Sequence, residues 1–119
     1  MSFLFNSLSY FLDENRDNIR QKICDYLQEN KKIIDGLETS DVLCFENTDS
    51  AKYIQNMRSL NTWGGAIEIQ VACNIWNMSV IVKNYRNMSN KDIEFIPVNG
   101  DCDKTIHIYW TGGHYEPIK

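Results

Sequence analysis

The 119-residue sequence lacks the patterns that mark several large classes of protein. It has no run of lysine and arginine, and its formal net charge of −4 argues against nucleic-acid binding and against a polybasic membrane anchor. It has no apolar run long enough to cross a bilayer, so we expect no membrane contact. Neither an internal repeat nor a linker-like stretch interrupts it. We therefore expect a single domain over residues 1–119.

The four cysteines are spaced too widely for a metal site. No CxxC pair occurs and neither histidine lies at zinc-finger spacing from a cysteine, so we predict no metal and no cofactor. Cys24 and Cys73 lie in apolar, periodic segments and are expected to be buried as small hydrophobic side chains. Unpaired cysteines of this kind favour a reducing, intracellular setting, namely the cytoplasm.

The first half of the chain predicts helices, since its apolar residues recur at helical spacing. Residues 3–12 are apolar on more than one helix face, which predicts a helix enclosed by other elements. The expected order is an enclosed helix over 3–12, a helix capped by Asp17, a short helix over 30–37, a loop over 39–48, a helix capped by Ser50, and a helix from Ala66 to about Trp76.

The second half predicts strands. Residues 78–85 are rich in β-branched side chains and read as a central strand. Shorter strands are expected over 93–96, 105–111 and 114–118, separated by polar turns. Helices followed by strands indicate an α+β fold, in which the helices pack around a small, mostly antiparallel sheet.

A histidine follows a Gly-Gly turn near the C-terminus. If residues 114–118 form a strand, His114 and Glu116 face the same way, and the carboxylate can orient the imidazole as a general base. The simpler interpretation is an exposed histidine beside a solvated glutamate. Spacing alone favours the simpler one, because His-x-Glu is common by chance.

Longer motifs resemble a known family, the OTU (ovarian-tumour-type) cysteine proteases, which are deubiquitinases. The resemblance covers nearly the whole chain. It is carried by TWGGAIEIQ at Thr62–Gln70 with Met57-Arg58 before it, by IHIYWTGGHYEPI at Ile106–Ile118, by FNSLSYFL at Phe5–Leu12 and by IRQKICDYLQEN at Ile19–Asn30. It implies an OTU-like α+β fold, with ubiquitin or a ubiquitin-like protein as the partner.

The resemblance also implies roles for particular residues. His114 matches the catalytic histidine, and Glu116 takes the place of the Asn or Asp that orients it. The family's nucleophile belongs to an Asp-Gly-x-Cys loop just before the first helix, and Phe3 falls where its cysteine belongs. On this alignment the aspartate of that loop would lie before Met1.

These correspondences predict an OTU-like domain that is catalytically inactive and acts as a ubiquitin-binding or scaffolding module. An alternative is an active cysteine deubiquitinase whose nucleophile lies upstream or has been relocated, with Cys44 as the candidate and Ser2 as a remote second choice. A second alternative is a structural interaction protein without affinity for ubiquitin.

Overall fold

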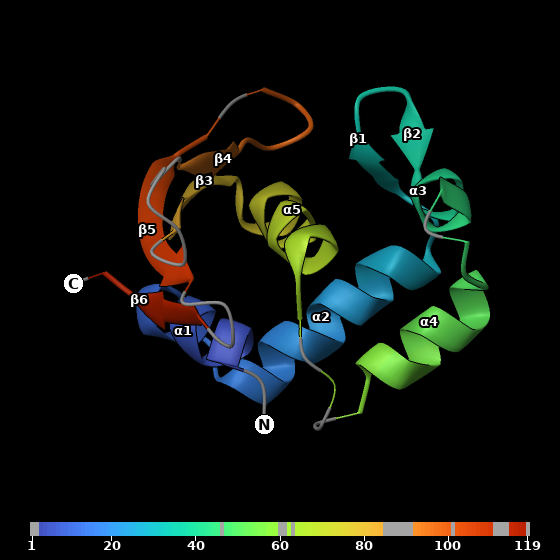
Figure 1. The fold of residues 1–119 in the computed structure, drawn as a ribbon, viewed down its shortest axis with the longest axis horizontal. Helices are drawn as coiled ribbons and strands as arrows, with labels where there is room; N and C mark the ends of the chain where they lie inside the picture. Colours follow the sequence, from blue (N-terminus) through green and yellow to red (C-terminus); the bar gives the residue numbers. More distant parts are fainter. Residues whose placement is uncertain are drawn as a thin grey trace.

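The computed structural model describes residues 3–45, 47–59, 62, 64–84, 92–100, 102–110 and 115–118. Helices dominate the first part and strands the second (Figure 1). The elements are α1 (Phe3–Phe11), α2 (Arg16–Gln28), β1 (Lys32–Ile34), β2 (Leu37–Glu38), α3 (Thr39–Phe45), α4 (Ser50–Met57), α5 (Ala66–Trp76), β3 (Met78–Asn84), β4 (Ile93–Phe95), β5 (Lys104–Trp110) and β6 (Tyr115–Pro117).

The main sheet has four strands in the order β4-β3-β5-β6. The two central strands, β3 and β5, run parallel, with Met78 opposite Lys104 and Asn84 opposite Trp110. The outer strands β4 and β6 pair antiparallel with them, and β1 and β2 form a separate antiparallel hairpin. Helix α5 packs against β3, and α1 lies against β6. The predicted α+β fold with a mostly antiparallel sheet is confirmed, and so is the central position of β3.

The first helix is enclosed, as its apolar pattern predicted. Leu4, Phe5 and Leu8 are at most 1% exposed and pack into the core shared by the helices and the sheet. Cys24 on α2 and Cys73 on α5 are buried in the same core, as expected. No helix in the described part of the chain is both long and apolar enough to cross a membrane.

Both predicted helix caps are displaced toward the N-terminus. Asn15, not Asp17, caps α2, and its side chain accepts a hydrogen bond from the backbone N–H of Asn18 at 2.8 Å. Asp49, not Ser50, caps α4 and accepts from the N–H of Ala51 at 3.3 Å. The sequence offered two capping side chains at each start, and propensity does not choose between such neighbours.

The segment between α2 and α4 differs from the prediction. The short helix expected over 30–37 is wrong, because Asn30 and Gly36 have φ angles of 56° and 82° and residues 32–38 form the β1–β2 hairpin. The loop expected over 39–48 is wrong as well, since residues 39–45 form α3. Leu43 of α3 is fully buried. Because the segment is too short to show a clear helical repeat of apolar residues, its packing in the folded protein, and not its local pattern, determines its conformation.

One side chain of α5 joins two distant segments to the helix. The amide nitrogen of Asn74 donates to the carbonyl of Ile33 in the hairpin at 3.0 Å, and its oxygen accepts from the N–H of Val98 at 2.8 Å. Next to it, Gln70 donates to the carbonyl of Ile96 at 2.7 Å. The hairpin and the segment after β4 are therefore held against the same helix.

Candidate functional site

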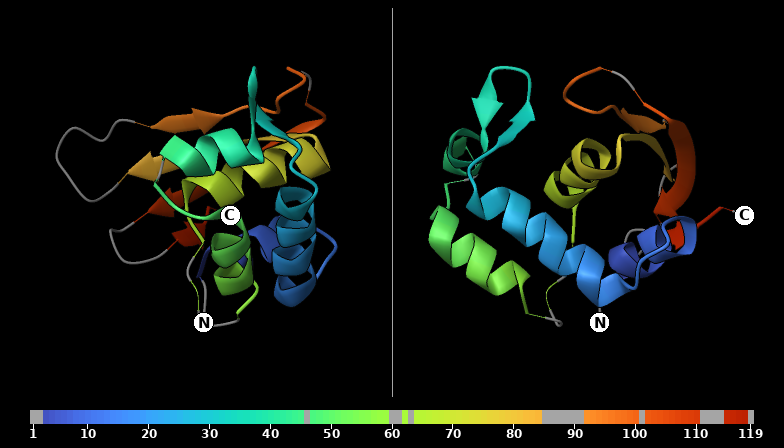
Figure 2. Two further views of the ribbon diagram at one scale, coloured as in Figure 1. Left: turned by 90° about the vertical axis from the view of Figure 1, so that its right-hand side faces the viewer. Right: turned by 180° about the vertical axis from the view of Figure 1, so that it is seen from behind.

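The candidate site lies where the first helix meets the last strand. Two views show α1 and β6 side by side, although they come from opposite ends of the chain (Figures 1 and 2). Phe3 is the first residue of α1, and Glu116 lies in β6 opposite Tyr109. The predicted catalytic His114 and the side chain of Phe3 lie outside the described residues. The fold thus brings together the two elements that carry the predicted site residues.

The strand that carries Glu116 also faces the interior of the molecule. Tyr115 is half-buried and packs against the core. Burial raises the pKa of its phenol, and the negative charge of Glu68 on α5 raises it further. This part of β6 therefore lies close enough to Glu68 for the two groups to interact.

The four cysteines differ in burial and in their position relative to α1 and β6. Burial raises the pKa of Cys24 to about 11 and that of Cys73 to about 12, so both thiols stay protonated at neutral pH. Cys44 and Cys102 are exposed. Cys102 precedes β5 at the end away from β6, and a seven-residue strand spans about 20 Å. Cys44 lies on α3, across the molecule from β6 (Figure 1).

The Gly-Gly pair of the first motif allows α1 to approach closely. A Cβ atom added to Gly64 would lie 2.7 Å from Cδ2 of Leu4 and 3.1 Å from Cζ of Phe5. Real Cβ atoms essentially never come within 2.7 Å of a neighbour, so the side chain of Leu4 would have to shift to admit any residue other than glycine. Gly65 has more room, because its nearest neighbour would be a carboxylate oxygen of Glu68 at 3.9 Å.

The glutamate of the same motif is buried, with 1% of its surface exposed. One carboxylate oxygen of Glu68 accepts from the backbone N–H of Gly65 at 2.7 Å and so caps α5. The other accepts from the hydroxyl of Tyr53 on α4 at 2.6 Å. Burial raises the pKa of Glu68, while both hydrogen bonds and the positive charge of Arg20 oppose that shift. The Glu68 side chain therefore joins the middle of α4 to the start of α5.

A buried arginine lies on the other side of this region. The guanidinium of Arg20 on α2 donates to the carbonyl of Met57 at 2.7 Å and stacks over the ring of Phe5, 4.4 Å from its centre. Burial lowers its pKa, and the negative charges around it, that of Glu68 among them, favour its protonated form. Arg20 thus links α1, α2 and the end of α4.

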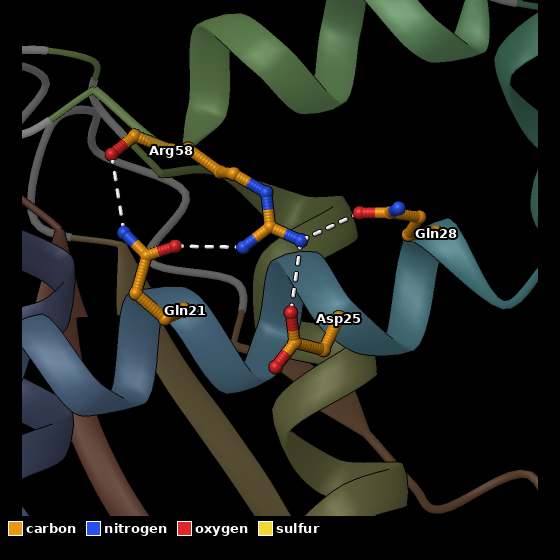
Figure 3. Close-up of polar contacts among 4 residues, drawn as sticks. All are labelled: Gln21, Asp25, Gln28 and Arg58. Carbon is orange, nitrogen blue, oxygen red and sulfur yellow. Dashed lines mark hydrogen bonds and ion pairs between the residues drawn. The ribbon is translucent and has the colours of Figure 1, made fainter.

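The arginine that follows α4 ties that helix to α2 (Figure 3). The guanidinium of Arg58 donates to the side-chain oxygens of Gln21 at 2.7 Å, Asp25 at 2.8 Å and Gln28 at 2.7 Å. Gln21 returns a hydrogen bond to the carbonyl of Arg58 at 3.2 Å. These contacts fix the point where the chain leaves α4 toward the Gly-Gly pair.

A pocket of about 560 Å³ opens between α4 and the first turn of α5. Tyr53, Asn56 and Met57 line it from α4, and Ile67 and Glu68 line it from α5. Its walls combine apolar surface, polar groups and one buried carboxylate. Among the described residues, no group of three or more His, Cys, Asp or Glu side chains could hold a metal ion.

Sequence reasoning missed the roles of Glu68, Tyr53 and Arg20. One signal could have pointed to Glu68. It stands three residues after Gly65, the N-cap of α5, which is the spacing of a capping box, and it is the one charged residue of that helix. No comparable signal marks Tyr53 or Arg20, because their partners lie on other elements.

Comparison with protein families identifies the class of protein. The model of the family described as OTU-like cysteine protease matches residues 4–115. The chain therefore belongs to this family, as its motifs indicated. A comparison with curated protein sequences finds no match.

Solved structures show the same fold. An ovarian tumor (OTU) domain in complex with ubiquitin is 20% identical, with a TM-score of 0.77 over 97% of this chain and 62% of that one. The OTU domain of OTUD1 is 15% identical, with a TM-score of 0.68 over 97% of this chain and 77% of that one. An OTU deubiquitinase from Wolbachia pipientis wMel, bound to ubiquitin, is 18% identical, with a TM-score of 0.67 over 98% of this chain and 88% of that one. This chain thus spans 62% of the length of the first of these domains.

Proposed function

We propose that this chain is an OTU-like domain, over residues 1–119, that binds ubiquitin or a ubiquitin-like protein without cleaving it. The observation that carries the proposal is that phenylalanine occupies position 3, the first residue of α1, the helix that lies against β6. The family resemblance puts the nucleophile at that position and the catalytic His114 just before β6.

The chemistry explains why this residue matters. A cysteine at a helix N-terminus beside a histidine is activated because the helix dipole and the imidazolium both stabilise its thiolate. A phenyl ring has no group that can attack a carbonyl carbon. An enzyme that loses its nucleophile keeps at most a small residual rate from binding and orientation.

The other cysteines are poor replacements. The thiols of Cys24 and Cys73 are buried with raised pKa values, and Cys102 lies at the far end of β5. Cys44 is exposed on α3 and is the candidate for the alternative in which an active nucleophile has been relocated. Because all four thiols are free, we also propose a reducing, intracellular location.

The partner is proposed from the fold neighbours. Two of the similar solved structures are OTU domains bound to ubiquitin. A domain that keeps this fold without the nucleophile can keep the binding surface, since binding a folded partner does not require the reactive group. His114 and Glu116 would then be retained positions of the site rather than working catalysts.

A ubiquitin probe that ends in a thiol-reactive electrophile tests the catalytic part. We expect no covalent adduct with the chain, and an active OTU deubiquitinase serves as the positive control. An adduct that disappears in His114→Ala would overturn the inactive assignment. In that case Cys44→Ser, with Cys102→Ser as its matched control, shows whether the nucleophile has moved to α3.

Binding is tested separately with isotope-labelled ubiquitin. Addition of the unlabelled chain should shift a contiguous set of ubiquitin resonances, with the same result for His114→Ala. The absence of any shift at high concentration of the chain would instead favour an interaction protein without affinity for ubiquitin.

A further inference from the structure

The loop between β4 and β5 contains an Asn-Gly pair, Asn99-Gly100. The sequence has 13 asparagines, and Asn99 alone is followed by glycine. The backbone nitrogen of a residue that follows asparagine can attack the side-chain amide carbon of that asparagine. Glycine favours this attack because it has no Cβ atom to obstruct the approach and its backbone rotates freely. The pair is therefore a candidate site of spontaneous covalent change.

The fold leaves this pair at the surface. Asn99 and Gly100 are both exposed, in the turn that follows Pro97. A Cβ atom built on Gly100 would have no neighbouring atom within 4 Å, so water reaches the glycine and a ring can form beside it. The φ angle of Gly100 is 84°, in the left-handed region that glycine adopts without strain.

One hydrogen bond restrains the attacking nitrogen. The N–H of Gly100 donates to the carbonyl of Pro97 at 2.9 Å and closes the turn. This bond must open before the nitrogen can face the side chain of Asn99. Hydrogen bonds of exposed loops open at little cost, because water replaces the lost partner. The turn should therefore slow the reaction several-fold relative to an unstructured peptide without preventing it.

Two other sites show why Asn99 is distinctive. Asn6 precedes the small residue Ser7, but both lie in α1 and Ser7 is buried. A helix directs the N–H of Ser7 along its axis and away from the Asn6 side chain. In the β1–β2 hairpin, Gly36 follows Asp35 and has a φ angle of 82°. There the side chain is a carboxylate, whose negative charge resists attack by a nucleophile.

We propose that Asn99 converts spontaneously to aspartate and isoaspartate in the folded protein, and that the change loosens this loop from α5. The backbone nitrogen of Gly100 loses its proton to hydroxide and bonds to Cγ of Asn99, which closes a succinimide ring. The bond from Cγ to the side-chain nitrogen breaks, and that nitrogen leaves as ammonia after gaining a proton from water. Water then opens the ring. Cleavage at Cγ gives aspartate, and cleavage at the main-chain carbonyl carbon gives isoaspartate.

Anchors on both sides of the pair explain the expected loosening. The N–H of Val98 donates to the side chain of Asn74 on α5 at 2.8 Å, and the N–H of Asp103 donates to the carbonyl of Asn77 at 2.8 Å. Isoaspartate routes the backbone through its Cβ atom and lengthens the chain by one atom between these anchors. Either product also adds a negative charge to a loop that contains Asp101 and Asp103 in the sequence.

The test incubates the whole chain for days at body temperature, at mildly acidic and at mildly alkaline pH. Trypsin then releases residues 92–104 as one peptide, in which Asn99 is the only asparagine. We expect this peptide to gain about one dalton, because an OH group replaces NH₂, and to split into two chromatographic peaks. The gain should be faster at the higher pH, since the attacking nitrogen must lose its proton. No gain, or a rate that does not rise with pH, would overturn the proposal.

Asn99→Gln is the matched control. Its longer side chain would have to close a six-membered ring, which forms far more slowly, so the peptide 92–104 should stay unchanged. Asn99 is exposed, so this substitution should not disturb the core. In the parent chain, Asn6 should remain intact over the same period. Equal conversion at Asn6 and Asn99 would contradict the assignment.

The structural effect is measured on the two forms of the parent chain. Anion exchange separates them, because the converted form carries an additional negative charge. Hydrogen exchange at the Val98 amide should be several-fold faster in the converted form, while exchange at Val80 in the centre of β3 should stay the same. Equal exchange at Val98 in both forms would overturn the loosening of the loop. None of these measurements involves ubiquitin, so their outcome is independent of the proposed function.

Discussion

The hydroxyl of Tyr53 donates a hydrogen bond to the carboxylate of Glu68 across 2.6 Å and joins α4 to the start of α5. The two residues are fifteen positions apart, and the segment between them holds the Gly-Gly pair that packs on α1. This contact therefore connects the region of the pocket with the helix that bears Phe3.

Tyr53→Phe should destabilise the protein by about 1–3 kcal/mol, because it leaves one oxygen of a buried carboxylate without its donor. Urea denaturation followed by circular dichroism measures the difference. Tyr10→Phe is the matched control: Tyr10 is 53% exposed, so water can replace its contacts and the change should be small. Equal stability of Tyr53→Phe and the parent chain would show that the hydrogen bond contributes little.

The buried carboxylate should make stability depend on pH. Burial raises the pKa of Glu68 in the folded protein above its ordinary value of 4.5. At pH values between the pKa of Glu68 in the unfolded chain and its higher pKa in the folded protein, the folded state binds more protons than the unfolded state. The contribution of Glu68 to stability therefore falls as the pH rises through this range and is constant above the folded-state pKa. Glu68→Gln abolishes this contribution.

The free energy of unfolding of the parent chain, minus that of Glu68→Gln, should therefore decrease as the pH rises above 4.5. Tyr53, Arg20 and Tyr115 interact with Glu68 and are present in both proteins, so most of their own titration cancels in the difference. Denaturation at a series of pH values measures the effect. A difference independent of pH would show that the pKa of Glu68 is not raised.

Gly64→Ala should destabilise the protein by about 1–3 kcal/mol, because the added Cβ atom overlaps Cδ2 of the buried Leu4 side chain, which must then shift. Gly65→Ala is the matched control, since its Cβ atom has room. It should reduce stability by at most about 1 kcal/mol, the amount by which alanine is a poorer N-cap. Thermal unfolding compares the two, and similar losses would argue against a close contact at Gly64.

Asn74→Ala should loosen both segments that the side chain holds. The carbonyl of Ile33 and the N–H of Val98 would lose their partner, with an expected loss of about 2 kcal/mol. Hydrogen exchange at the Val98 amide should accelerate more than at the centre of β3. Asn56→Ala, at an exposed position, should leave that exchange rate unchanged.

Leu8→Ala tests the enclosed first helix. Leu8 has no exposed surface, so the truncation leaves a cavity and should destabilise the protein by about 3–5 kcal/mol. Ile93→Ala removes the same number of carbon atoms at a position that is 52% exposed and should have a far smaller effect. Urea denaturation measures the free energy of unfolding of both variants. Equal losses in the two variants would contradict the prediction that the first helix is enclosed.

Much of the fold could be predicted from the sequence, because long apolar patterns reflect burial directly. The helices predicted over 3–12 and from 66 to about 76 are confirmed over Phe3–Phe11 and Ala66–Trp76, and the strand predicted over 78–85 is confirmed over Met78–Asn84, because each is long enough to show its apolar pattern. Residues 30–48 were not, because the hairpin and α3 are short and are held by partners from elsewhere, such as Asn74 for the hairpin. The helix and strand propensities of these residues do not depend on such contacts and therefore cannot predict them.

For the candidate site, the sequence by itself determined the family and the identity of the residue at position 3, since both depend on the order of residues alone. Only the tertiary structure decided that α1 and β6 lie side by side, that a side chain at position 64 would overlap Leu4, and that Glu68 is buried beside a pocket. The reason is physical: the burial of an ionisable side chain and the contact between two elements are set by segments far apart in the chain.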